Sequence, residues 1–99
     1  MELPTVEQIR ETAIAIDPKF AKAVARWDIE VGRDWQGDPG VFVIIVLKDS
    51  EAHRVWESRR DYKDRLRNRL WAMLPEGYFP YITYSAESVA LDPEIPARR

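Results

Sequence analysis

The stretch Val41–Leu47 contains only apolar residues (Val-Phe-Val-Ile-Ile-Val-Leu), in a chain in which 32% of the residues are charged. Side chains alternate between the two faces of a strand, and a strand with two apolar faces is typical of a sheet that is covered on both sides. The two sets here are Val41, Val43, Ile45 and Leu47 on one face, and Phe42, Ile44 and Val46 on the other. A chain of 99 residues forms one domain with one core, so we expect it to cover only one face.

Composition narrows the classes of protein to which this chain can belong. Hydrophobic residues make up 45% of the chain, with four Trp, four Tyr and three Phe, which predicts a packed globular domain. The absence of cysteine excludes disulfides, thiolate catalysis and cysteine-ligated metal sites, and it fits the reducing cytoplasm. The N-terminus lacks a signal-peptide pattern, and the apolar run is far shorter than the roughly 20 residues that span a bilayer. We therefore expect a cytoplasmic protein without membrane contact.

The first half of the chain predicts two helices followed by a hairpin. Thr5 and Gln8 form a capping-box pattern, which predicts a helix over about 6–16. Asp17 and Pro18 end it and begin a short second helix, because Pro lacks an N–H and favours the first helical position. From 26 to 33 apolar and polar residues alternate, as in a strand with one buried face. Turn-forming residues over 34–40 then predict an antiparallel hairpin with the apolar run.

The second half predicts a long helix and a third strand. Helical spacing of apolar residues indicates a helix over about 51–73, and 81–84 is typical of a strand that Pro80 opens or places at an edge. The expected inward stripe of this helix is Ala52, Val55, Trp56, Arg59, Tyr62, Leu66, Leu70 and Met73. The tryptophans expected in the core are Trp27, Trp56 and Trp71. A crossover through the helix places the third strand parallel to the second and beside it.

These elements predict an α+β fold with a three-stranded mixed sheet, helices packed on one face and the order α-(α)-β-β-α-β. The segment 41–47 becomes the central strand. Residues 1–86 are expected to form the single domain. Residues 87–99 lack periodicity and are expected to form a flexible C-terminal tail.

The uncovered face of this sheet predicts a protein-binding surface. Contiguous apolar surface is uncommon on a monomer, so another protein or a second copy of the chain is expected to cover it. Trp35 in the hairpin loop can either fold back onto the sheet or anchor a partner. The residues expected to contact the partner are Trp35, Phe42, Ile44, Val46 and Tyr84. The tail from Glu87 is the other candidate to cover this face.

The long helix offers an alternative surface, for RNA. It carries seven basic residues against four acidic ones, with aromatic residues beside them. The candidate nucleic-acid contacts are Arg60, Lys63 and Arg67. However, several of these charges lie three or four residues from an opposite charge, as on a salt-bridged solvent face, and the net charge of the chain is −2. A protein partner is therefore favoured over RNA.

An enzymatic function would rest on few residues. His53 is the only histidine, and nothing near it in sequence completes a triad or a metal set, so a solvated or capping role is favoured. Asp28, Glu30, Asp34 and Asp38 concentrate around the hairpin. Their spacing does not match a calcium loop and favours turn hydrogen bonds instead. We expect no catalytic residue, no metal and no cofactor.

Several segments resemble a group of small uncharacterised bacterial proteins. They are 3–9 (Leu-Pro-Thr-Val-Glu-Gln-Ile), 16–20 (Ile-Asp-Pro-Lys-Phe), 27–32 (Trp-Asp-Ile-Glu-Val-Gly) with Asp34 and 37–39 (Gly-Asp-Pro), and 80–83 (Pro-Tyr-Ile-Thr). The resemblance covers residues 3 to about 86. Some members of this group are encoded beside HEPN-type RNases, in the manner of an antitoxin or companion subunit. The resemblance implies a binding partner and no enzyme activity, and it transfers no site residues.

Overall fold

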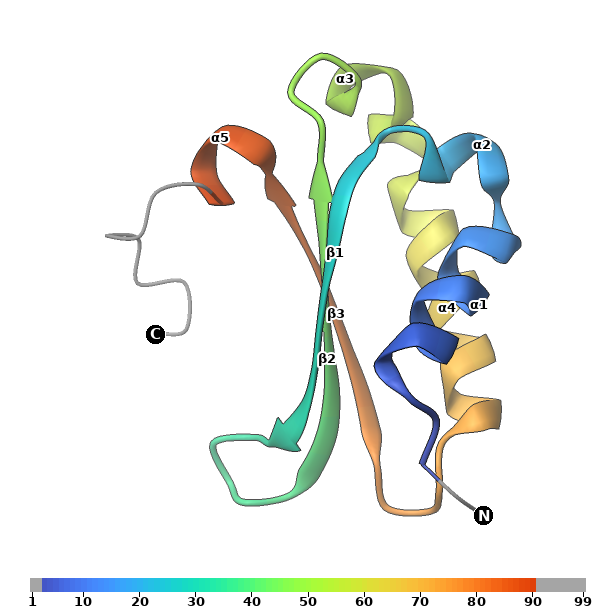
Figure 1. Ribbon diagram of the computed structural model, residues 1–99, viewed down its shortest axis with the longest axis vertical. Coiled ribbons are helices and arrows are strands. Elements are labelled where there is room, and N and C mark those ends of the chain that lie inside the picture. Colours follow the sequence, from blue (N-terminus) through green and yellow to red (C-terminus); the bar gives the residue numbers. More distant parts are fainter. Residues whose placement is uncertain (1–2, 91–99) are drawn as a thin grey trace.

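The computed structural model of the protein describes residues 3–90 and has the predicted order of elements (Figure 1). Helices α1 (Val6–Ile16) and α2 (Pro18–Ala21) precede strands β1 (Val24–Arg33) and β2 (Pro39–Leu47). A helical segment follows in three pieces, which are α3 (Ala52–Val55), the 3₁₀ turn η1 (Trp56–Ser58) and α4 (Arg59–Met73). Strand β3 (Phe79–Ala86) and the short helix α5 (Glu87–Ala90) come last.

The sheet has the strand order β1-β2-β3, so β2 is central, as predicted. β1 runs antiparallel to β2, and β3 runs parallel to it. Pro80 is tolerated in β3 because β3 is an edge strand. Figure 1 shows α1 and α4 together on one side of the sheet and α5 on the other side, near one end. We call the side of α1 and α4 the covered face and the opposite side the open face.

The core fills the space between the covered face and the helices. Val43 and Ile45 of β2 are fully buried in the same cluster as Leu66 of α4. Tyr62 of α4 stacks on Phe20 of α2 with ring centroids 4.2 Å apart, and its hydroxyl donates a hydrogen bond to a carbonyl oxygen of α1. Each fully buried aliphatic side chain contributes about 1.5–3 kcal/mol relative to an exposed one. Packing therefore holds the helices on the covered face, and the buried hydrogen bond of Tyr62 joins α4 to α1.

Local hydrogen bonds explain where the first two helices begin. The Thr5 N–H donates to the Gln8 side chain at 2.8 Å, and the Gln8 N–H donates to the Thr5 hydroxyl at 3.1 Å. This is the predicted capping box. The Asp17 carboxylate accepts the Phe20 N–H at 3.1 Å and caps α2. The N-termini of both helices could be predicted from the sequence because capping is a local interaction.

The long helix predicted over 51–73 is interrupted by η1, and two tryptophans expected in the core are not buried. Trp56 is 50% exposed and Trp71 is 54% exposed, so the prediction of their burial is wrong. Each follows a buried residue, Val55 or Leu70, by one position, and one helical position turns a side chain by about 100°. The buried stripe of this helical segment is therefore narrower than the predicted inward stripe. Trp27, by contrast, is half-buried and packs against the core.

The segment predicted as a tail begins with α5, which contacts β2 and β3. Asp49, just after β2, holds α5 in place: its N–H donates to the Glu87 carboxylate and its own carboxylate accepts the Ser88 N–H, both at 3.4 Å. The rest of the predicted tail, 91–99, lies outside the described residues. In the part of the chain that the structure describes, no helix is long and apolar enough to cross a membrane.

Candidate functional site

The register of the strands decides which side chains share the open face. Residues paired across neighbouring strands point to the same side of a sheet. Phe42 of β2 is paired with Glu30 of β1 and with Tyr81 of β3. The open face therefore carries Arg26, Asp28, Glu30 and Gly32 from β1, Gly40, Phe42, Ile44 and Val46 from β2, and Phe79, Tyr81, Thr83 and Ser85 from β3.

Aromatic side chains concentrate at one end of the open face, next to the loop between β1 and β2. The Tyr81 ring stacks on Phe42 with centroids 5.1 Å apart, and it lies 4.7 Å from Phe79 and 6.0 Å from Trp35. Trp71, from α4, meets Phe79 edge-on at 5.1 Å. We call these five residues the aromatic platform. Trp35 is 81% exposed and Phe79 43% exposed, so the platform presents apolar surface that the described residues leave uncovered.

Asp34 holds the hairpin loop that carries Trp35 next to the Tyr81 ring of the platform. One oxygen of the Asp34 carboxylate accepts the N–H groups of Gln36 and Asp38 at 2.8 and 2.9 Å, and the other accepts the Tyr81 hydroxyl at 2.9 Å. Burial by itself would raise the pKa of Asp34, but the hydrogen bonds from Asp38, Tyr81 and Gln36 outweigh it and lower this pKa. The hydrogen bond to Asp34 also raises the pKa of Tyr81. The loop is thus tied to β3 across β2 before any ligand binds.

Gly40 allows the Tyr81 ring to lie close to the sheet. A Cβ atom at Gly40 would be 3.1 Å from that ring and 3.3 Å from the carbonyl oxygen of Phe79. Its cross-strand neighbour Gly32 has no other atom within 4 Å of the same position. The packing of the platform therefore leaves little room for a side chain at Gly40, whereas it leaves open space at Gly32.

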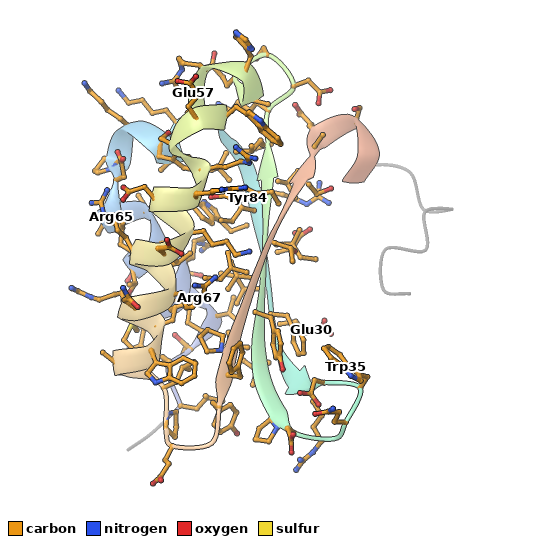
Figure 2. The ribbon with its side chains drawn as sticks, turned by 180° about the vertical axis from the view of Figure 1, so that it is seen from behind. Glu30, Trp35, Glu57, Arg65, Arg67 and Tyr84 are labelled. Carbon is orange, nitrogen blue, oxygen red and sulfur yellow. The ribbon has the colours of Figure 1, made fainter. Side chains whose placement is uncertain are left out.

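Acidic side chains lie on one side of the platform, along β1 and the hairpin loop. Figure 2 shows Glu30 and Trp35 at the same end of the sheet, on the side away from α4. The carboxylates of β1 and the hairpin loop outnumber the guanidinium groups; they are Asp28, Glu30, Asp34 and Asp38 against Arg26 and Arg33. Arg26 forms an ion pair with Asp28 at 2.9 Å, and Arg33 donates a hydrogen bond to a loop carbonyl at 2.7 Å. The surroundings of the platform therefore favour a cationic ligand.

Three of the predicted partner contacts, Trp35, Phe42 and Ile44, lie on the open face or beside it. Phe42 and Ile44 are half-buried in the isolated chain. Val46 belongs to the same row of β2 but is fully buried, because α5 contacts β2 on this side. Val46 is thus already covered within the chain.

Tyr84 lies on the covered face, which corrects its placement among the partner contacts. It is paired with Ile45, and its hydroxyl donates a hydrogen bond to the carbonyl of Arg59 in α4 at 2.6 Å (Figure 2). Burial raises its pKa well above the ordinary value, so the hydroxyl remains a donor. Tyr81, three positions earlier, takes the place on the open face. The pattern Phe79-x-Tyr81 would have indicated this, had the third strand been predicted to start at Phe79.

The three candidate RNA contacts share one stripe of α4. Arg60, Lys63 and Arg67 are spaced by three and four positions, and the stripe continues to Trp71 at the rim of the platform. Arg67 forms an ion pair with Asp64 at 3.2 Å. Within the described residues no ion pair involves Arg60 or Lys63, so part of this stripe remains open to an anion.

The structure separates His53 from the carboxylates of the hairpin loop, the residues on which an enzymatic function would rest. His53 is exposed in α3, at the opposite end of the sheet from the carboxylates of the hairpin loop (Figure 1). No group of three or more His, Asp or Glu side chains that could hold a metal ion occurs in this part of the chain. An open groove of about 570 Å³ lies between α1 and α4. Its lining is Thr12, Ala15, Ile16, Arg65, Asn68, Arg69 and Ala72.

No protein-family model, no curated protein and no solved structure matches this chain. The choice among functions therefore rests on the geometry and charge of the molecule itself. Of its surfaces, the open face combines exposed aromatic rings with a loop that is already ordered.

Proposed function

We propose that this protein is a protein-interaction domain that binds a partner protein through the open face and regulates that partner. The observation that carries the proposal is the aromatic platform, in which Trp35 is 81% exposed although Asp34 fixes its loop. Trp and Tyr are typical anchors of protein interfaces, and side chains that are ordered beforehand lose little conformational entropy on binding. The platform therefore has the properties of a preformed contact surface.

Charge defines the segment of the partner that docks on the platform. The carboxylates around it favour a segment with Lys or Arg beside apolar residues. A cation over the face of an exposed Trp or Tyr ring contributes about 0.5–1 kcal/mol. The described part of the chain contains such a contact, since the guanidinium of Arg59 lies 3.7 Å from the centroid of the Trp56 ring.

The resemblance to proteins encoded beside HEPN-type RNases supports an enzyme as the partner and an antitoxin-like role for this chain. A companion of this kind acts by occupying a surface of the enzyme. It needs a rigid contact surface and no reacting group of its own, which agrees with a domain whose exposed Trp35 lies in a hydrogen-bonded loop.

The test compares Ile44→Asp on the open face with Arg60→Glu on α4. Each tagged chain is isolated from cells that make the protein, and the proteins bound to it are quantified by mass spectrometry. We expect one partner at reproducible stoichiometry with the parent chain and with Arg60→Glu, and its loss with Ile44→Asp. Trp35→Ala, which leaves every strand residue in place, should also lose it.

Circular dichroism must show that the variants are folded. The proposal is contradicted if folded Ile44→Asp and Trp35→Ala keep the partner, if Arg60→Glu alone loses it, or if no protein binds the parent reproducibly.

RNA binding is the second candidate, favoured by the continuity of the stripe of Arg60, Lys63 and Arg67 with Trp71. Phosphate contacts make affinity depend on salt, and aromatic rings stack on unpaired bases. Titration with a labelled single-stranded RNA at two salt concentrations tests it. We expect tighter binding at low salt and weaker binding by Arg60→Glu/Lys63→Glu. Absence of saturable binding at both salt concentrations excludes this candidate.

A further inference from the structure

We propose that two copies of this chain pair through the edge of β1 that faces away from β2, so that the three strands of each copy join in one continuous sheet. We call this edge the free edge. The inference does not rest on the function proposed for the open face. It follows from the difference between the two edges of the sheet, from apolar side chains beside the free edge, and from the order of charges along β1.

The two edge strands differ in how well they are protected against a further strand. β3 carries Pro80, which cannot donate a backbone hydrogen bond, and Pro on an edge strand opposes pairing. β1 has ten residues without Pro, and among the described residues no strand lies on its outer side. Its register against β2 shifts between Val24 and Arg26, so the strand is regular from Arg26 onward, where its charged residues lie. The free edge therefore presents a long row of backbone N–H and C=O groups.

The covered face is filled over β2 and β3 but not over β1. Val43 of β2 is fully buried and Ile82 of β3 is 4% exposed, whereas Val31 of β1 is 36% exposed. Trp27 and Ile29, on the same face of β1, are only partly buried. Apolar surface therefore continues to the free edge, where the strand and helix of a second copy would cover it.

Helix α1 adds an exposed apolar side chain on the same side of the molecule. α1 contacts β1, and its residue Thr12 lines the groove toward α4. Ile14 is turned by about 160° from Thr12 around the helix, so it points away from α4, and it is 39% exposed. The carbonyl of Ala13 accepts the Tyr62 hydroxyl, and the Tyr62 and Trp27 ring centroids are 6.3 Å apart. Ile14 therefore lies near the level of Trp27, beside the free edge.

The charges of β1 decide how a second copy can pair with it. In an antiparallel pair with two-fold symmetry, the strand is centred on one residue, and side chains on the same face of the two copies lie opposite each other. A centre at Trp27 places Arg26 opposite Asp28 of the second copy, and Asp28 opposite Arg26. A centre at any other residue of 26–30 would bring two like charges face to face. β1 is therefore complementary to itself in the register centred on Trp27.

This register keeps the ion pair that already exists within each chain. Arg26 lies 2.9 Å from Asp28 of its own chain. Around the two-fold axis, the two guanidinium groups and the two carboxylates would alternate in sign. Each charge then has an opposite charge along its own strand and another across to the second copy. On the covered face, the two copies of Trp27 face each other, and aromatic cross-strand pairs are stabilising.

Sedimentation equilibrium of the full chain over a range of concentrations tests the pairing. We expect a reversible dimer for the parent chain. Arg26→Asp and Asp28→Arg each place like charges opposite one another at both cross-strand positions, so each should raise the Kd of the dimer about tenfold or more. The double variant Arg26→Asp/Asp28→Arg restores opposite charges at both positions and should dimerise like the parent.

A mixture of the two single variants separates contacts between copies from contacts within one chain. Neither variant retains its internal ion pair, yet a strand of one variant meets opposite charges on a strand of the other, so the mixture should dimerise again. Ile14→Lys should also weaken the dimer, because it places a cation in an apolar contact. Arg54→Asp is the control, since it removes a comparable exposed ion pair with Glu51, outside β1, and should keep the Kd of the parent.

Circular dichroism must show that the variants are folded, as expected for exposed positions. The proposal is overturned if the parent is monomeric over the whole concentration range, if the folded single variants dimerise as tightly as the parent, or if the double variant and the mixture stay monomeric. A dimer that Ile44→Asp abolishes and Arg26→Asp leaves intact would form through the open face, and it would overturn the proposal as well. The measurement contains no partner protein, so each of these results is separate from partner capture by the open face.

Discussion

The two faces of β2 are both apolar in sequence, yet the molecule uses them differently. On the covered face, Val43 and Ile45 are fully buried beneath helices of the same chain. On the open face, Phe42 and Ile44 remain half-buried, and Phe42 stacks on the Tyr81 ring. Apolar character alone therefore does not say whether a strand face is core or contact surface. The elements that the rest of the chain places against it decide this.

Polar groups make the same distinction between the faces. On the covered face, the Tyr84 hydroxyl of β3 donates to a carbonyl of α4 and holds this helix on the sheet, and the Tyr62 hydroxyl of α4 donates to a carbonyl of α1 and joins the two helices. On the open face, Asp34 uses its hydrogen bonds to hold the Tyr81 hydroxyl and the loop that carries the exposed Trp35. The first arrangement stabilises a fold, and the second preorganises a surface.

The largest expected effect comes from truncating neighbouring isoleucines of β2 on opposite faces. Ile45→Ala should reduce the free energy of unfolding by about 2–5 kcal/mol, because the removed atoms leave a cavity in the core. Ile44→Ala should reduce it by only about 1 kcal/mol, because this side chain is already partly solvated. Urea unfolding of the two variants measures the difference. Equal losses would show that the open face is packed in solution as tightly as the core, and the distinction would be wrong.

The prediction of the fold succeeded where interactions are local. The capping box of Thr5 and Gln8 and the Asp17 cap depend on residues three positions apart, and strand alternation depends on immediate neighbours. The prediction also placed β2 centrally and β3 parallel to it, since a crossover through a helix allows little else.

The prediction of the site was incomplete where the interactions are distant. The hydrogen bond from the Tyr81 hydroxyl to Asp34 joins residues 47 positions apart, and no local sequence pattern indicates it. The sequence prediction names Tyr84 as a partner contact and does not name Tyr81, because the face on which each lies depends on the register between β3 and β2. The apolar stripe of the helix predicts Trp71 in the core, but Trp71 follows buried Leu70 by one helical position, and this single position separates core from platform.

A medium effect is expected from two glycines that face each other across β1 and β2. Gly40→Ala places a methyl group 3.1 Å from the Tyr81 ring, so that ring or the strand must move, and the free energy of unfolding should fall by about 1–3 kcal/mol. Gly32→Ala meets no atom within 4 Å and should change it by at most about 0.5 kcal/mol. Urea unfolding gives both values.

The glycine pair also tests whether packing of the platform positions Trp35. The indole N–H shift of Trp35 should move in Gly40→Ala and stay unchanged in Gly32→Ala. An unchanged shift in both variants would mean that the hairpin loop holds Trp35 without help from the Tyr81 ring.

The smallest effect is a change with pH that is confined to the open face. The pKa of Asp34 in the folded chain lies below its ordinary value of 3.8, so ionised Asp34 stabilises the folded loop above that pH. This contribution is lost as the pH falls through the folded pKa, because a protonated carboxyl accepts the N–H groups of Gln36 and Asp38 poorly. The Trp35 indole shift should therefore change below pH 3.8. In Asp34→Ala it should already resemble the acid form at neutral pH and show no such step.

On the covered face, burial raises the pKa of Tyr62 and Tyr84, so their stabilisation persists in acid and is lost only as the pH rises above 10 through their folded values. Circular dichroism recorded with the Trp35 shift separates the two faces: a loop transition that precedes global unfolding supports the distinction, and a single coincident transition contradicts it.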